Sequence, residues 1–175
     1  MGTAASVSFA EMTFLMQQMP SYQTYRSLEE AAIAERTFRH ALGAMLKECG
    51  DRLLSVAERT ALILTSEQEV MLGNLVERIA SIFRRLDREG AVCLVGDCEA
   101  TIAELEEIDT RLILLIEEAL FLVRNLGLNP QSSRWFQRQA PLLSRDLAAF
   151  SEAAEERNYL LGLGWESEFT WHGRG

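Results

Sequence analysis

Carboxylates and histidines are the residues of this sequence whose spacing could hold a metal. Glu117 and Glu118 interrupt the apolar stretch LILLIEEALFLV, residues 112–123. A helical bundle holds two iron ions when Glu side chains and Glu-x-x-His pairs project inward from facing helices. Neither His40 nor His172 has a Glu three residues before it. The sequence therefore predicts no metal site.

Cysteines are the second group with possible chemistry. The chain has three, Cys49, Cys93 and Cys98, so they cannot all pair within one molecule. The gap between Cys93 and Cys98 differs from the two-residue gap of zinc and redox motifs. A chain of 175 residues is also large enough to form a core without a disulfide framework. We expect reduced, structural thiols in a cytoplasmic protein.

Sequence motifs for catalysis are missing. The chain contains no Gly-x-Ser-x-Gly, phosphate-binding loop or dinucleotide-binding fingerprint. We therefore predict no catalytic residues and no cofactor, and the sequence favours a binding protein over an enzyme. A site assembled from ordinary Ser, Glu and Arg side chains leaves no motif. An enzyme or a small-ligand sensor with a pocket inside a helical bundle therefore stays the alternative.

Composition and charge narrow the partners. The sequence is 48% apolar and 25% charged, which is typical of a soluble globular protein. Its formal charge of −9 repels phosphate backbones, so we expect no nucleic-acid partner. The apolar stretch 112–123 is shorter than the roughly 20 residues that a transmembrane helix needs. The N-terminal segment MGTAASVSFAEMTFLMQQMP also lacks the charged and long apolar regions of a secretory signal.

The elements that must position these residues are helices. Apolar residues recur every three or four positions in long stretches, and the sequence has no hairpin signal and no sustained alternation. We predict an all-α protein, an antiparallel bundle of about four long helices with a short N-terminal helix. The expected segments are 9–19, 28–64, a second long helix carrying Leu72, Leu75, Ile79, Ile82 and Leu86, then 98–126 and 141–161, with a possible helical turn at 131–139. The first long segment is either one helix or two collinear pieces hinged near Gly50 and Asp51.

Local start and stop signals support these helices. A capping box places Ser at the first position and Glu three residues later, where both satisfy free backbone N–H groups. Such boxes are Ser8-x-x-Glu11, Ser27-x-x-Glu30 and Ser66-x-x-Glu69. Glycine closes the last turn of many helices in a left-handed conformation. The candidates for this role are Gly90, Gly127 and Gly162.

The chain divides into three parts. Residues 1–26 form an N-terminal arm with the short helix, residues 27–162 form the bundle, and residues 163–175 form an aromatic tail. Trp165 and Phe169 in the tail are four residues apart, which is the spacing of two anchors on one helix face, and Trp171 follows them. The tail either binds a partner or folds back over the end of the bundle.

The helix expected at 98–126 carries the second candidate surface. Its seam consists of Leu105, Ile108, Leu112, Leu115, Ala119, Leu122 and Leu126. Glu117 and Glu118 then project to the opposite, solvated side. Leu114, Leu120 and Phe121 also lie off the seam. They are buried if this helix is central in the bundle, and they form an exposed stripe if it lies at an edge. We predict that this stripe, with the aromatic tail, binds a protein partner, expected to be helical, and pairs two copies as a homodimer.

Two stretches are similar in pattern to the flagellar export chaperones that hold hook-associated proteins. They are LLSVAERTALILTSEQEVMLGNLVERIASIFRRL, residues 53–86, and LLSRDLAAFSEAAEERNYLLGL, residues 142–163. Paired leucines, a polar break, and further Leu or Phe at helical spacing carry the resemblance, which assigns no role to any single residue. It implies a small, acidic, helical bacterial protein. Together with the surface features, it predicts a non-enzymatic protein that binds a partner, as a cytosolic adaptor or secretion-type chaperone.

Overall fold

The computed structural model describes residues 15–20, 22, 25, 27–86 and 92–163 of the chain. The predicted tail anchors Trp165, Phe169 and Trp171 lie outside these residues. So do Gly90, the box Ser8-x-x-Glu11 and most of the helix expected at 9–19, of which residues 15–18 are helical.

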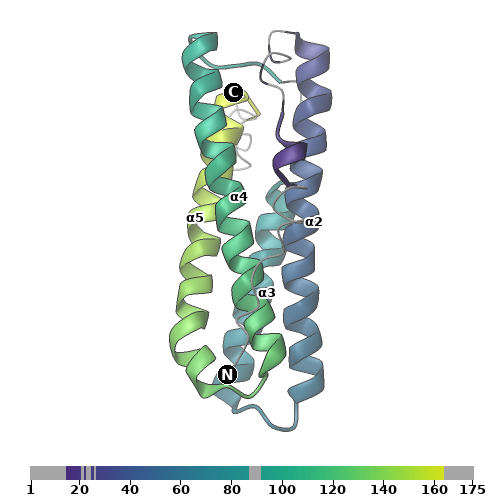
Figure 1. Cartoon of the computed structure of the whole chain (residues 1–175), viewed down its shortest axis with the longest axis vertical. Helices are drawn as coiled ribbons and strands as arrows, with labels where there is room; N and C mark the ends of the chain where they lie inside the picture. Colours follow the sequence, from purple (N-terminus) through teal and green to yellow (C-terminus); the bar gives the residue numbers. More distant parts are fainter. Residues whose placement is uncertain (1–14, 21, 23–24, 26, 87–91, 164–175) are drawn as a thin grey trace, which may run out of the picture.

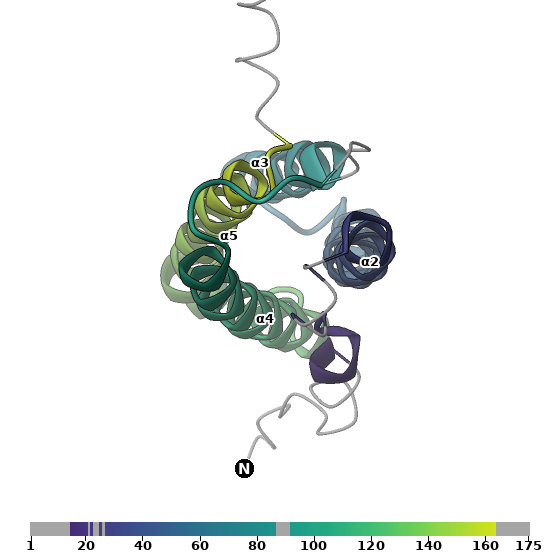
Figure 2. The same cartoon turned by 90° about the horizontal axis from the view of Figure 1, so that it is seen from above.

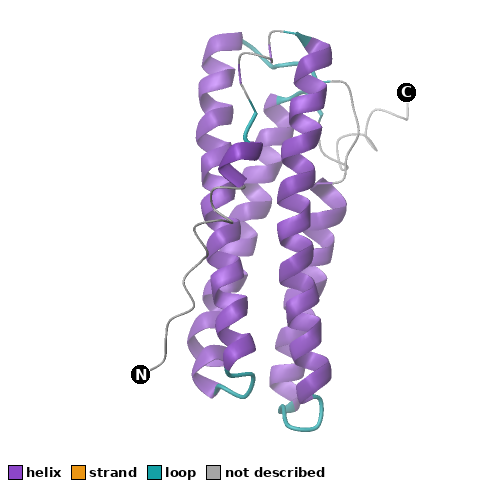
Figure 3. Ribbon diagram, turned by 45° about the vertical axis from the view of Figure 1, so that its right-hand side comes forward, coloured by secondary structure: helices purple, strands orange, loops and turns teal. Residues whose placement is uncertain are grey.

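Four long helices make up most of the described part of the chain, and their direction alternates along the sequence (Figure 1 and Figure 3). They are α2 (Leu28–Thr60), α3 (Ser66–Leu86), α4 (Cys98–Leu128) and α5 (Ala140–Leu160). A short π-helix, η2 (Trp135–Gln139), precedes α5, within the segment expected to form a helical turn. The part of the chain that the structure describes contains no strand, so the predicted all-α bundle is confirmed.

The order of the helices around the bundle differs from their order along the chain. Seen from above, they follow one another as α2, α3, α5 and α4 (Figure 2). Accordingly α2 packs against α3 and α4, and α5 packs against α4 and α3. Residues 92–97, which lead into α4, therefore lie across the end of the bundle.

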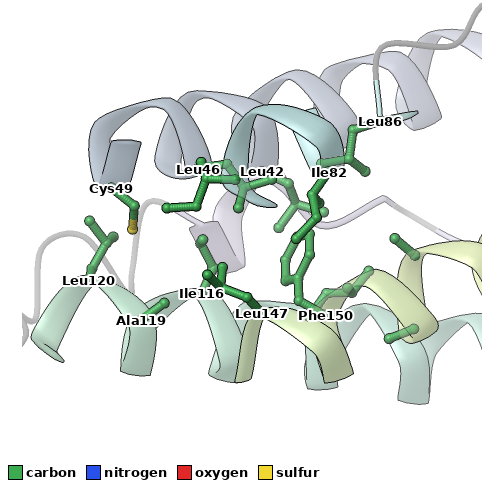
Figure 4. Packing of buried hydrophobic residues seen from close by; sticks show 14 of the residues in the cluster. Leu42, Leu46, Cys49, Ile82, Leu86, Ile116, Ala119, Leu120, Leu147 and Phe150 are labelled. Atoms are coloured by element: carbon green, nitrogen blue, oxygen red, sulfur yellow. The ribbon is translucent and has the colours of Figure 1, made fainter. Parts of the chain in front are cut away.

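The core consists of the stripes that the apolar spacing predicts. All five apolar residues expected on α3, from Leu72 to Leu86, are buried. Helix α2 continues through Gly50 without a break, and a Cβ atom on Gly50 would lie 3.4 Å from the Ile79 side chain of α3. Figure 4 shows how Leu42 and Leu46 of this helix face residues of α4 and α5.

Two of the predicted helix caps differ from expectation. The capping box of α3 begins one residue earlier than predicted: the Gln68 N–H donates to the Thr65 hydroxyl at 3.3 Å, and the Thr65 N–H donates to the Gln68 side chain at 3.0 Å. The pair Thr65 and Gln68 has the same chemistry as the predicted pair Ser66 and Glu69, so the pattern alone could not choose between them. Ser27 precedes α2 but makes no side-chain cap hydrogen bond.

Gly162 ends α5 as predicted, whereas Gly127 lies inside α4. The φ angle of Gly162 is +69°, and its N–H donates to the Tyr159 carbonyl at 3.0 Å while the Leu163 N–H donates to the Asn158 carbonyl at 2.9 Å. This is the Schellman arrangement. The chain at Cys93 crosses directly over Gly162, and a Cβ atom there would collide with the Cys93 carbonyl oxygen. Only glycine fits both the conformation and the space.

Replacing Gly162 with alanine will lower the free energy of unfolding by about 1–3 kcal/mol, because the new methyl group meets strained backbone and the Cys93 carbonyl. Urea denaturation measures the change. Gly73→Ala is the matched control: Gly73 is exposed within α3 and has no atom near its missing Cβ, so alanine there should stabilise by up to about 1 kcal/mol. Equal effects of the two substitutions would contradict the steric requirement for glycine at position 162.

The three thiols should differ sharply in reactivity. Burial raises the pKa of the Cys49 thiol to about 12, whereas Cys93 is exposed. Because the thiolate is the reactive form, a thiol reagent at neutral pH will modify Cys93 in the native protein and reach Cys49 only after unfolding. A Cys93→Ser variant should lose the corresponding part of the native reaction. Modification of Cys49 at the rate of Cys93 would show that this part of the core opens.

Candidate functional site

Four charged side chains from three helices meet inside the bundle. Glu35 and Arg39 come from α2, Asp109 from α4 and Arg157 from α5, and all four are buried. They lie in the half of the bundle where α2 and α4 begin and α5 ends. Charged residues are almost never buried this completely unless they are paired. We call these four residues the charged cluster.

Arg157 is the centre of the charged cluster. Its Nε donates to Asp109 Oδ1 at 2.6 Å, and its Nη1 donates to Glu35 Oε1 at 3.0 Å. The other oxygen of Glu35 lies 3.5 Å from Arg39 Nη2. The Arg157 guanidinium also lies over the ring of Phe38, 5.2 Å from its centroid. Two positive and two negative groups thus compensate each other within one contiguous network.

Burial and pairing act in opposite directions on these groups. Burial raises the pKa of Asp109, while the charge and hydrogen bond of Arg157 and the hydrogen bond of Tyr22 lower it. Burial alone would lower the pKa of Arg157, but Asp109, Tyr25 and Glu35 raise it above its ordinary value, so the guanidinium stays charged. Removing an ion from water costs several kcal/mol, and only well-placed partners offset that cost. Each ion of the charged cluster therefore depends on the others.

The N-terminal segment covers this cluster. The Tyr22 hydroxyl donates to the second oxygen of Asp109 at 3.0 Å, and its ring stacks on Tyr25 with 5.7 Å between centroids. Burial is the main cause that raises the pKa of both tyrosines. Tyr25 and Leu15 are buried in the same core as the long helices. The short helix at residues 15–18 lies between α2 and α4 in Figure 1 and Figure 3. The described residues between 15 and 25 are thus packed on the bundle.

The chemistry available to the charged cluster is limited by its burial. Both carboxylates are held by arginines and closed off from solvent, so an external substrate cannot reach them. Among the residues that the structure describes, no three His, Cys, Asp or Glu side chains gather as they would around a metal ion. The arrangement is suited to holding α2, α4, α5 and the N-terminal segment together.

The predicted surface stripe on α4 is only partly present. Leu114 is 60% exposed, and Phe121, two turns away, is partly buried against the core. Leu120 is only 1% exposed and lies beside Cys49 of α2 (Figure 4), so the expectation that it joins an exposed stripe is wrong. Neighbouring helix residues are separated by about 100° of rotation, and this turns Leu120 into the core while Phe121 stays at its margin.

The same rotation separates the two glutamates. Glu118 is exposed as expected, but Glu117 is only 6% exposed, so its predicted place on the solvated edge is wrong. Helix α4 buries far more of its circumference than one seam, because α2 and α5 both pack against it. The outcome matches neither alternative in full, because α4 is one of four helices around the bundle (Figure 2), with Leu120 buried and Leu114 exposed. None of the helices in the described ranges is long and apolar enough to span a bilayer.

The charged cluster itself was not predicted from the sequence. A usable signal exists in Asp109, which directly follows Ile108 and lies four residues after Leu105 and three before Leu112, on the predicted seam. A charge within an apolar stripe requires a buried partner. Arg157 lies 48 residues from Asp109 and 122 residues from Glu35 in the sequence, however, so helical spacing does not identify these pairs.

Comparison of the chain with protein-family models, with curated proteins and with solved structures finds no match.

Arg157→Met should lower the free energy of unfolding by about 3–5 kcal/mol, because it leaves Asp109 and Glu35 buried without their shared cation. Arg111→Met is the matched control. Arg111 also joins α4 to α5, through Glu156 at 2.6 Å, but both of these side chains are about half exposed. Its loss should cost less than about 1 kcal/mol. Chemical denaturation measures the free energy of unfolding of both variants. Similar losses would mean that burial does not strengthen the ion pairs of the charged cluster.

Proposed function

We propose that this chain is a non-enzymatic helical-bundle protein that binds a helical segment of a partner protein, as an adaptor or secretion-type chaperone in the bacterial cytoplasm. The observation that carries the proposal is the packing of the chain's own N-terminal segment. The described residues between 15 and 25 lie outside the four-helix layer, yet they bury Leu15 and Tyr25 against it. The surface of the bundle that Leu15, Tyr22 and Tyr25 cover is therefore a binding site for an additional segment, and we call it the seat.

The seat combines apolar burial with a polar anchor. Apolar contacts supply most of the free energy of such docking, and a hydrogen bond such as that from Tyr22 to Asp109 fixes its position. A partner helix that presents an aliphatic residue and aromatic residues with a hydroxyl, as Leu15, Tyr22 and Tyr25 do, matches this seat. We propose that it binds in place of the N-terminal segment.

The outer face of α4 extends the proposed binding surface. Leu114 is exposed on α4, and Phe121 follows two turns later. Isolated apolar side chains on a surface are ordinary, but two in line along a helix match the spacing of anchors in a docked helix. The tail residues Trp165, Phe169 and Trp171 are proposed as further anchors. In the absence of a partner, the same surface is the proposed interface of a homodimer.

Site-specific photo-crosslinking tests this proposal. A benzophenone amino acid at position 114, introduced in the native host, should crosslink to a reproducible protein partner, and the crosslinked partner peptide should belong to a helical segment. The same amino acid in place of Arg84, which is exposed on α3, is the control and should give no such product.

A substitution then tests the surface directly. Leu114→Glu should weaken binding of the identified partner by about tenfold or more, because it places a charge on an apolar anchor. The substitution leaves the fold intact because Leu114 is exposed. Crosslinking at position 84 equal to that at position 114, or full binding by Leu114→Glu, would contradict the proposed surface.

A further inference from the structure

A hollow of about 290 Å³ lies between α2 and α3, away from the seat of the N-terminal segment. Its volume is at the lower end of the range of small-molecule sites, roughly 300–1,000 Å³. The residues that line it are Arg39, His40, Gly43, Ala44, Lys47, Phe83 and Leu86. Arg39 thus belongs both to the charged cluster and to this surface hollow.

The lining is basic in a strongly acidic protein. The chain carries a formal charge of −9, yet Arg39, His40 and Lys47 line the hollow, and none of the described residues that line it is Asp or Glu. Lys47 already pairs with Asp51 at 2.6 Å on the exposed side of α2. Arg39 is therefore the cation best placed to bind an anion here.

Arg39 has unused hydrogen-bonding capacity. Its side chain is only 5% exposed, and its ion pair with Glu35, from Nη2, is long at 3.5 Å. Two further nitrogens, Nε and Nη1, have no hydrogen-bond partner in the described structure. Leaving a buried donor without an acceptor is unfavourable, so an acceptor seated beside Arg39 would be favoured.

The rest of the lining is apolar and small. Gly43 and Ala44 leave room along α2, and a Cβ atom on Gly43 would lie only 3.3 Å from the Phe83 ring. Phe83 and Leu86 of α3 form the apolar wall, and Phe83 is partly open to solvent. A ligand matching this hollow has an anionic head for Arg39 and a short apolar body for Phe83 and Leu86.

We propose that this hollow binds a small amphipathic carboxylate of the medium-chain acyl type. The carboxylate accepts hydrogen bonds from Arg39, and the acyl chain lies against Phe83 and Leu86. Inorganic phosphate matches only the basic part of the hollow, and a neutral alcohol matches only the apolar part. This proposal is independent of the partner-binding function.

Calorimetric titration of the full chain with octanoate tests the ligand class. Octanoate should bind with a Kd of about 1 mM or tighter, and octanol and inorganic phosphate should each bind about tenfold more weakly. Equal binding of octanol would remove the role of Arg39, and equal binding of phosphate would remove the role of the apolar wall. No binding of octanoate would overturn the proposal.

Three variants locate the site. Arg39→Gln should weaken octanoate binding by about tenfold through loss of the charged donor. Ala44→Phe should weaken it at least as much by filling the hollow, and because Ala44 is exposed, this variant keeps the fold and decides the matter if Arg39→Gln is unstable. Arg59→Gln, an exposed arginine at the far end of α2, is the control and should bind normally. Normal binding by Ala44→Phe would overturn the assignment to this hollow.

Discussion

The ion pairs of Arg157 inside the bundle are the constraint on which the rest of the structure depends. One guanidinium joins Asp109 of α4 to Glu35 of α2, and Asp109 in turn holds Tyr22 of the N-terminal segment. Charges removed from water are tolerated only when their partners are placed within hydrogen-bonding distance. A shift of α5 by one turn along α4, about 5.4 Å, would separate these atoms. The charged cluster therefore sets the relative positions of three helices, which apolar packing alone would leave open to sliding.

The two halves of the bundle are consequently held in different ways. Where α2 ends, apolar residues such as Cys49 and Leu120 fill the interior (Figure 4). Where α2 begins, α2 and α4 diverge (Figure 1), the charged cluster lies in the interior, and Tyr22 of the N-terminal segment donates to it from outside the four-helix layer. Polar contacts are directional, so this half of the bundle is specific for a segment whose hydrogen-bonding groups match those of the charged cluster. This difference is why we propose that a partner replaces the N-terminal segment in this half, and Arg39, at the margin of the charged cluster, has donors left for a ligand.

The sequence predicts features that depend on a pattern along one helix. The spacing of Leu72 through Leu86 predicted the buried face of α3, and the glycine at 162 predicted the end of α5. The sequence does not predict features that depend on a single residue position. The capping box begins at Thr65 and not at Ser66, and Glu117 and Leu120 each lie one residue from a neighbour with the opposite exposure. The charged cluster joins residues up to 122 positions apart, and no local pattern records such a pairing.

A double-mutant cycle on Asp109 and Arg157 tests the central claim most directly, through the free energy of unfolding of Asp109→Asn, Arg157→Met and the combined variant. Residues in contact within one charged network couple by about 0.5–3 kcal/mol. Because each ion of the charged cluster depends on its partners, we predict a coupling in the upper half of that range, with the combined variant losing clearly less than the sum of the single losses. Additive losses, within about 0.5 kcal/mol, would contradict the account.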